Sequence, residues 1–278
     1  MVLPRWLPAL FFLLPLTGCT YAFYHPDHVV YYSPAALGLE VREIRFSSAD
    51  GTKLQGWFFP AQNTLAVKGT IVQFHGNSEN MTSQFASLHW PTRHGYNLFT
   101  FDYRGYGSSE GEPSQEGTYL DGMAALDKAW QLRTGARFVV IGQSLGGAIA
   151  MRSFADFQHQ RETQLVVLDS TFASYKAEAR RLLASHWYTW PVSLFGPVLI
   201  SDKFAAKEAI ARDRTRLLIV ADRRDPIVSF ANGEEIFRLA RAPKDLWVLD
   251  QGRHIQVFNA RNVGYRNRFL SLLEEIVD

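Results

Sequence analysis

One stretch, residues 138–147, constrains the fold of this 278-residue chain more than any other. It reads Phe-Val-Val-Ile-Gly-Gln-Ser-Leu-Gly-Gly, an apolar run that ends in Gly-x-Ser-x-Gly and leads into an Ala-rich helical pattern. A chain that leaves a buried strand and enters a helix within one residue needs strained backbone at Ser144, with glycines where a Cβ atom would collide. Such a turn exposes the Ser144 Oγ atom and directs the backbone N–H of Leu145 towards a developing oxyanion. The stretch therefore predicts a nucleophilic serine at the carboxyl end of a strand.

Strand-like and helix-like patterns alternate through most of the chain. Helical spacing is clear at 119–132 and 229–240. The apolar runs that predict strands are 41–47, 53–59, 69–74, 97–102, 137–142, 165–169, 216–221 and 245–249. We therefore expect an α/β fold with a mostly parallel central sheet and helices on both faces. The first two strands, joined by a short turn that contains Asp50 and Gly51, predict an antiparallel hairpin at the sheet edge.

The composition fits one domain without a nucleic-acid partner. With 47% hydrophobic residues, the chain can bury one large core. The 29 Lys and Arg residues against 27 Asp and Glu give a net charge of +2 without a long basic run, which argues against binding to nucleic acid or anionic lipid. No Cys/His cluster has metal-ligand spacing, and residues 142–147 lack the lysine of a phosphate-binding loop. We expect no metal, no cofactor and a monomer.

The N-terminal residues 1–18 are typical of a signal peptide. Arg5 precedes an apolar stretch that is shorter than the roughly 20 residues of a membrane-spanning helix. The stretch ends in Leu-Thr-Gly-Cys at residues 16–19, which resembles the lipobox of bacterial lipoproteins, where the cysteine is lipid-modified and becomes the first residue after cleavage. Cys19 is the only cysteine of the chain. An uncleaved hydrophobic anchor with an incidental cysteine is the alternative.

The lipoprotein resemblance also implies a location. It implies attachment to a membrane of a bacterial cell envelope through lipid on Cys19. Thr20 follows the cysteine, and the absence of Asp at this position favours the outer over the inner membrane in lipoproteins of this kind. Residues 19–40 contain two prolines and several tyrosines, and we expect them to form a tether that lies on the domain at 41–278.

A nucleophilic serine needs a base and an acid. Of the eight histidines, His254 stands in a short Gly-containing loop directly after the last predicted strand, where its imidazole can reach Ser144. The acid is expected after the preceding strand, in the chain order Ser, Asp, His. That loop holds Asp222 and Asp225. Asp225 precedes Pro and an apolar pair and is the preferred acid, whereas Asp222 can instead cap the loop or pair with an arginine.

Five motifs together resemble the α/β-hydrolase superfamily, most closely its Bem46-like branch and the related ABHD-type serine hydrolases. The motifs are Phe-His-Gly-Asn at 74–77, Asp-Tyr-Arg-Gly-Tyr-Gly-Ser-Ser-Glu-Gly at 102–111, Gly-Gln-Ser-Leu-Gly-Gly at 142–147, Asp-Pro-Ile-Val at 225–228 and Gly-Arg-His at 252–254. The resemblance implies that Asn77 supplies a second oxyanion N–H beside that of Leu145. It also implies a bracing role for His75 and for the turn at 102–107.

The chain departs from the pattern of this branch at two positions. Asp222 stands where a glycine is usual, and Ile255 follows the histidine where a polar residue is common. These departures put the geometry of the acid loop in doubt but not the fold.

The hydrolase resemblance implies a serine hydrolase of the carboxylesterase or thioesterase type, and the lipobox resemblance implies that it is anchored to a membrane. Ser144, Asp225 and His254 would cleave a small acyl ester or thioester through an acyl-enzyme. A short cap inserted at about 173–203 contains the aromatic segment 186–191, which either lines an acyl pocket or packs the cap onto the core. A serine peptidase with the same triad, and a membrane-anchored binding protein without activity, are the alternatives.

Overall fold

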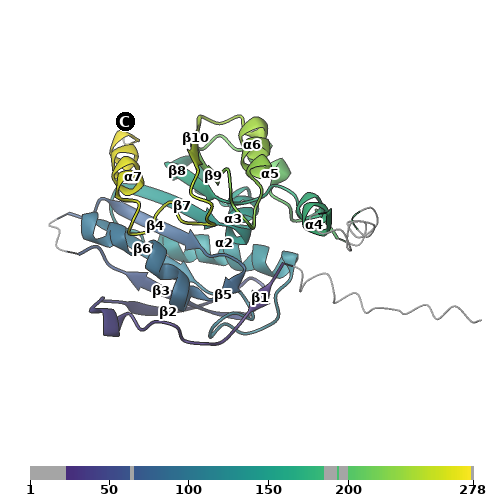
Figure 1. The fold of residues 1–278 in the computed structure, drawn as a ribbon. Helices are drawn as coiled ribbons and strands as arrows, with labels where there is room; N and C mark the ends of the chain where they lie inside the picture. The colour runs from purple at the N-terminus through teal and green to yellow at the C-terminus, as the bar shows by residue number, and fades with distance from the viewer. Residues whose placement is uncertain (1–22, 63–65, 185–192, 194–199, 277–278) are drawn as a thin grey trace, which may run out of the picture.

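The computed structural model describes residues 23–62, 66–184, 193 and 200–276. Within these residues, eight strands form one sheet in the order β10-β9-β8-β7-β4-β6-β3-β2 (Figure 1). The strands are β2 (Arg42–Ser47), β3 (Lys53–Phe59), β4 (Gly69–Phe74), β6 (Tyr96–Phe101), β7 (Arg137–Gln143), β8 (Leu165–Asp169), β9 (Leu217–Asp222) and β10 (Lys244–Leu249). Each lies within two residues of a strand predicted from the sequence. The six strands from β3 to β9 in this sheet are almost wholly buried, as their apolar runs predict, whereas β2 and β10 are partly exposed.

The sheet is parallel except at one edge. β4 pairs in parallel with β6 and β7, and the parallel pairing continues through β8 and β9 to β10. β2 and β3 form an antiparallel hairpin in which Arg42 lies opposite Phe58, and β3 then pairs antiparallel with β6. The predicted α/β fold, with a mostly parallel sheet, is confirmed, and so is the hairpin at its edge.

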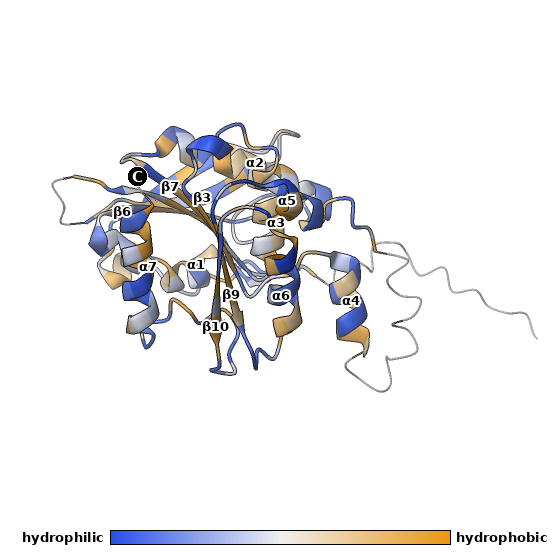
Figure 2. Ribbon diagram, turned by 90° about the horizontal axis from the view of Figure 1, so that it is seen from above, coloured by the Kyte–Doolittle hydropathy of each residue, from blue (hydrophilic) through white to orange (hydrophobic). Residues whose placement is uncertain are grey.

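Two hydrophobic cores, one on each face of the sheet, follow from the alternation of side chains along each strand. In β7, Val140 contributes to the core under α2 (Gln115–Leu132), α3 (Leu145–Phe154), α5 (Lys207–Arg212) and α6 (Phe230–Leu239). Its neighbours Val139 and Ile141 belong to the other core, beneath α1 (Met81–Gln84), the short helix η4 (Trp90–His94) and α7 (Val263–Glu275). Figure 2 shows α1 and α7 on one side of the sheet and α3, α5 and α6 on the other.

The segment predicted to be a tether lies against the domain from residue 23 onwards. Phe23 and Tyr24 are buried, and the Tyr24 hydroxyl is 3.1 Å from Thr118 Oγ1 on α2. The next two residues form the short strand β1 (His25–Pro26), which pairs in parallel with β5 (Ser78–Glu79). This N-terminal segment therefore reaches the loop that follows β4.

Three sequence predictions fall on residues outside the described ranges. They are the signal peptide at 1–18, the lipid attachment at Cys19 and the aromatic segment at 186–191 of the predicted cap. The described residues of the predicted cap include the helix α4 (Tyr175–Ala184). In the described ranges, no helix combines the length and the apolar character that a bilayer crossing requires.

Candidate active site

Ser144 occupies the single residue between the end of β7 and the start of α3. Its backbone has φ 54° and ψ −125°, which is a strained conformation for a residue with a side chain. The turn is closely packed, because a Cβ atom at Gly146 would overlap the carbonyl oxygens of Phe74 and His75. The backbone strain and the need for glycine are those that the pentapeptide predicts, and they place Ser144 at the N-terminus of α3.

Asp225 and His254 lie in the two loops that follow β9 and β10. The distance from His254 Nδ1 to Asp225 Oδ2 is 2.7 Å, and the carboxylate is almost fully buried while 17% of the imidazole is exposed. The other Asp225 oxygen accepts the backbone N–H groups of Ile227 at 2.8 Å and Val228 at 3.0 Å. The carboxylate is therefore fixed on one side by its own loop, and on the other side it orients the imidazole.

Asp222, the alternative acid, has a different set of contacts. Its carboxylate accepts backbone N–H groups of Arg224, in its own loop, and of Gln251 and Gly252, in the loop that carries His254, at 2.8 to 3.2 Å. Burial alone would raise the pKa of Asp222, but these hydrogen bonds outweigh it and hold the pKa below its ordinary value. Asp222 thus ties the two loops together, and its carboxylate binds backbone rather than the imidazole.

The loop at Gly76 and Asn77 lies beside Ser144. A Cβ atom built on Gly76 would be 3.6 Å from Ser144 Cβ. Three hydrogen bonds fix this loop: Gly76 N–H donates to Gln84 Oε1 at 2.9 Å, and the Asn77 carbonyl accepts from His25 N–H at 3.0 Å and from the Tyr106 hydroxyl at 2.8 Å. The sequence does not reveal that an N-terminal residue, His25, holds the predicted oxyanion loop.

A second His-Asp pair, His75 and Asp102, is buried below this loop. His75 Nε2 is 3.4 Å from Asp102 Oδ1, and the same carboxylate oxygen accepts Met81 N–H at 2.7 Å. The Tyr103 hydroxyl donates to the His75 carbonyl at 3.0 Å. Because these groups are inaccessible to a substrate, their contacts are those of a brace between the loops after β4 and β6.

Asp169 is a further acidic residue that the sequence interpretation missed. It ends β8, its carbonyl accepts Ser144 N–H at 2.9 Å, and its carboxylate is 3.3 Å from Gln143 Nε2. Burial raises the pKa of Asp169 to about 6, an effect that the Gln143 hydrogen bond and the nearby His254 oppose. Its position at the carboxyl end of a predicted strand is the signal that could have identified it.

Ser144 and His254 are not joined by a hydrogen bond in the described structure, in which the Ser144 hydroxyl and His254 Nε2 have no hydrogen-bond partner among the described residues. Asp169 contacts the Ser144 backbone and interacts electrostatically with His254, so all three groups meet at the carboxyl ends of β7 and β8. Catalytic hydrogen bonds are often long before substrate binds. The geometry thus brings a strained serine and an Asp-oriented imidazole to one edge of the sheet.

The chain is similar to known proteins in sequence. Residues 66–214 match the model of the Hydrolase_4 family, described as serine aminopeptidase, S33. The uncharacterized protein YfhR of Salmonella typhi is 32% identical over 295 residues, which cover 97% of this chain and 96% of YfhR. Protein bem46 of Schizosaccharomyces pombe is 29% identical over 148 residues, covering 52% of this chain and 48% of bem46.

A solved structure shares the fold. The Pyrococcus furiosus esterase Pf2001 superimposes with a TM-score of 0.70 at 21% sequence identity, over 93% of this chain and 99% of the esterase. At this identity the likeness establishes the fold and not the activity. Taken with the family match over residues 66–214, it shows that the chain belongs to the Hydrolase_4 family of α/β-hydrolases, in its Bem46-like branch.

Proposed function

We propose that this protein is a serine hydrolase that cleaves acyl esters or thioesters through an acyl-enzyme. The observation that carries the proposal is the 2.7 Å contact between Asp225 and His254 at the sheet edge where Ser144 is held in a strained turn. A buried carboxylate that orients an imidazole with one accessible nitrogen is the arrangement that activates a serine hydroxyl.

The reaction follows from the chemistry of these groups. His254 Nε2 accepts the proton of Ser144 Oγ as the oxygen attacks the acyl carbonyl, and Asp225 stabilises the imidazolium that results. The backbone N–H groups of Asn77 and Leu145 bind the oxyanion. His254 then donates its proton to the leaving group, and water, deprotonated by the same imidazole, releases the acyl group from Ser144.

A serine peptidase is the second candidate, and the description of the matching family as serine aminopeptidase favours it. The two activities share the triad and differ in the substrate that the pocket accepts. The experiment compares 4-nitrophenyl esters of increasing acyl length with aminoacyl 4-nitroanilides, using the purified domain and its Ser144→Ala variant. We expect Ser144-dependent turnover of the esters. Turnover of the anilides alone would show that the protein is a peptidase and not an esterase. Turnover of neither class would favour a non-catalytic binding protein.

We also propose that the protein is attached to a membrane of the bacterial envelope through lipid on Cys19, with the outer membrane favoured over the inner membrane. Support comes from the N-terminal segment, where Val29, Val30 and Tyr32 are 56%, 71% and 52% exposed. Apolar and tyrosine side chains close to an acyl anchor suit the membrane interface. Intact-mass analysis of the mature protein tests this: we expect a chain that starts at Cys19 and carries acyl mass. A chain that retains Met1 would indicate an uncleaved anchor.

A further inference from the structure

A hollow of about 610 Å³ opens beside the candidate active site. One wall comes from residues near α1 and η4, and the opposite wall from the loop after His254 and from α7. The lining residues that matter for its chemistry are Tyr32, Gln84, Trp90, Arg93, Ile255 and Arg266. This volume lies in the range of pockets that hold small molecules.

Two lining residues connect the hollow to the reacting groups. Gln84 Oε1 accepts the backbone N–H of Gly76. Gly76 in turn lies next to the serine, because a Cβ atom built on it would be 3.6 Å from Ser144 Cβ. Ile255 directly follows His254 and has φ 46°, a left-handed conformation that is rare for a β-branched residue. Strain of this kind persists only where the surroundings enforce it, and here it accompanies an apolar side chain in the wall of the hollow. The walls of the hollow are therefore connected to the serine through Gln84 and Gly76, and to the imidazole through Ile255.

The hollow contains two arginines without a carboxylate partner among the described residues. Arg266 donates its Nε–H to the Phe258 carbonyl at 2.8 Å, and its Cζ atom lies 4.9 Å from the centre of the Trp90 ring. These contacts fix the guanidinium but leave its terminal nitrogens available. Arg93 is exposed and forms no ion pair with the residues described.

His89 lies in the same hollow and is within electrostatic reach of both arginines. Burial lowers the pKa of the His89 imidazole, and the charges of Arg93 and Arg266 lower it further. His89 Nδ1 lies 3.1 Å from the Ala86 carbonyl, and this contact opposes the lowering of the pKa without outweighing it. Glu79 is the only carboxylate among the described residues that line the hollow. The two arginines therefore give the lining an excess of positive charge.

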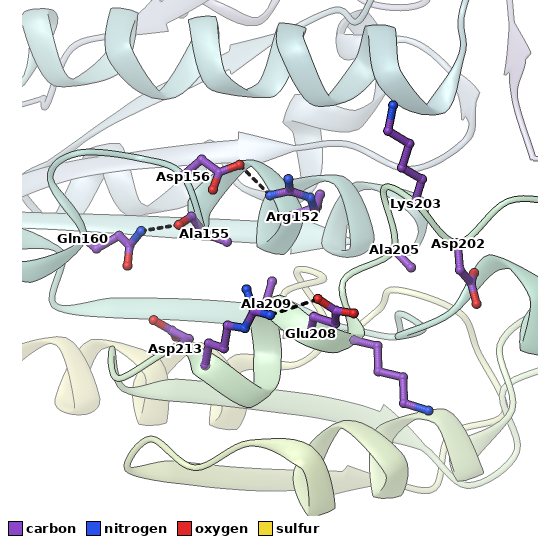
Figure 3. Close-up of a pocket in the computed structure, with 12 residues that line it drawn as sticks. Arg152, Ala155, Asp156, Gln160, Asp202, Lys203, Ala205, Glu208, Ala209 and Asp213 are labelled. Atoms are coloured by element: carbon purple, nitrogen blue, oxygen red, sulfur yellow. Dashed lines mark hydrogen bonds and ion pairs between the residues drawn. The ribbon is translucent and has the colours of Figure 1, made fainter.

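The groove between α3 and α5 provides a contrast (Figure 3). It is also lined by charged residues, but there Arg152 lies 2.7 Å from Asp156 and Arg212 lies 3.2 Å from Glu208. Arginines that are already paired have little to gain from a bound anion, whereas unpaired guanidiniums bind carboxylate or phosphate oxygens, often through two hydrogen bonds. The arginines of the hollow are thus more available to an anion than the arginines of the groove.

We propose that this hollow is a substrate subsite in which Arg93 and Arg266 bind an anionic oxygen group, a carboxylate or a phosphate, of the ester that Ser144 attacks. Trp90 and Ile255 contact the apolar part of the same substrate. The inference rests on the proposed hydrolase function and narrows it to esters that carry a negative charge away from the scissile bond.

The test measures a preference ratio, the kcat/KM for an anionic ester divided by that for its neutral counterpart. One pair is the 4-nitrophenyl half-ester of succinate against 4-nitrophenyl butyrate, with the charge on the acyl side. The other is 4-carboxyphenyl acetate against phenyl acetate, with the charge on the alcohol side. For at least one pair, Arg93→Gln should lower the ratio at least fivefold, mainly through the KM of the anionic ester.

Arg268→Gln is the matched control, because Arg268 also lies on α7 but stacks on Trp247, with its Cζ atom 4.4 Å from the ring centre, and does not line the hollow. Its ratios should stay within twofold of the unmodified protein. Arg266→Gln should act like Arg93→Gln, and the exposed Arg93 keeps the test valid if the change at Arg266 destabilises the fold. Equal ratios for Arg93→Gln and Arg268→Gln in both pairs would overturn the proposal.

Calorimetric titration of the unmodified protein with succinate and with inorganic phosphate separates this proposal from the proposed function. We expect millimolar binding of at least one anion, weakened at least fivefold in Arg93→Gln but not in Arg268→Gln, and the stronger ligand identifies the group as carboxylate or phosphate. Binding without ester turnover would contradict the hydrolase and leave the anion site standing. Turnover without Arg93-dependent binding or preference would contradict the anion site alone.

Discussion

Two His-Asp pairs lie at the carboxyl ends of the strands, and their surroundings differ. In one, His254 Nδ1 is 2.7 Å from Asp225, 17% of the imidazole is exposed, and Nε2 has no hydrogen-bond partner among the described residues. In the other, His75 is fully buried, with Nδ1 2.8 Å from the Gly76 carbonyl and Nε2 3.4 Å from Asp102. An imidazole can accept a proton from a nucleophile only through a nitrogen that the substrate side can reach. The two pairs therefore have the same residue types but different roles. The first is suited to catalysis, and the second holds together the loops after β4 and β6.

The largest effect should come from the accessible pair and its serine. Replacing Ser144 or His254 by Ala should lower kcat/KM for a soluble ester by on the order of 10⁴-fold or more, because members of a triad act as a unit. The melting temperature should stay near that of the unmodified protein, since neither side chain contributes to the cores. Steady-state kinetics and thermal unfolding measure both. A His254→Ala variant with activity within tenfold of the unmodified protein would contradict the catalytic role of the His254–Asp225 pair.

The next effect separates the two acids. Asp225→Asn should lower kcat/KM about 10³- to 10⁴-fold, because the amide no longer holds the imidazole in the required tautomer. Asp222→Asn should retain more activity and lose more stability, since its carboxylate accepts three backbone N–H groups that join the acid and histidine loops. Kinetics and urea unfolding of both variants decide the matter. An active Asp225→Asn beside an inactive Asp222→Asn would show that the acid is Asp222.

The buried pair should affect stability instead. Asp102→Ala removes the acceptor of Met81 N–H and the charge that faces His75, and we expect a loss of about 2–4 kcal/mol in the free energy of unfolding. The activity of the fraction that remains folded should fall by no more than about tenfold. Urea unfolding and kinetics at low temperature test this. A stable Asp102→Ala protein without activity would give the buried pair a catalytic role.

Asp169 should make the free energy of unfolding depend on pH. Its folded pKa of about 6 exceeds the ordinary value of 3.8, so the folded state binds the proton more tightly than the unfolded state. Asp169 therefore costs stability progressively as the pH rises from about 4 to 6, and above that range the cost is complete. Asp169→Asn should gain roughly 1–3 kcal/mol relative to the unmodified protein between pH 4 and pH 7. A stability difference that does not change with pH would show that the pKa is not raised.

The smallest effects concern the N-terminal segment. A domain that begins at residue 23 should hydrolyse a soluble ester within twofold of the full chain, because it keeps the buried Phe23 and Tyr24 and the His25 N–H that binds the Asn77 carbonyl. Beginning at residue 33 removes the His25 N–H that holds the Asn77 carbonyl and should lower kcat by about tenfold through the oxyanion loop. The two truncations, compared at equal folded concentration, test this. Equal activity of both would show that the segment does not position the loop.

The sequence predicts the sheet, the hairpin and the serine turn because these depend on local patterns. Apolar runs specify strands, and a pentapeptide with two glycines permits only one kind of turn around Ser144. The chain order of Ser144, Asp225 and His254 likewise follows from the order of the strands.

Other features depend on contacts between segments far apart in the chain. The sequence favours Asp225 over Asp222 as the acid but does not exclude Asp222, because both stand in one loop and only the path of the loop decides which one faces the imidazole. The raised pKa of Asp169 depends on burial by other elements, and the contact of His25 with Asn77 joins residues about fifty positions apart. Neither has a local pattern that would predict it.

The most direct test of the central claim is labelling with a fluorophosphonate, which forms a covalent adduct with an activated serine. Peptide mass spectrometry should find the adduct on Ser144 in the unmodified protein and none in Ser144→Ala. His254→Ala should react at least a hundredfold more slowly, whereas Asp102→Ala, assayed where it is folded, should react within tenfold of the unmodified rate. An adduct on another residue, or equal rates with and without His254, would contradict the assignment of the accessible pair to catalysis.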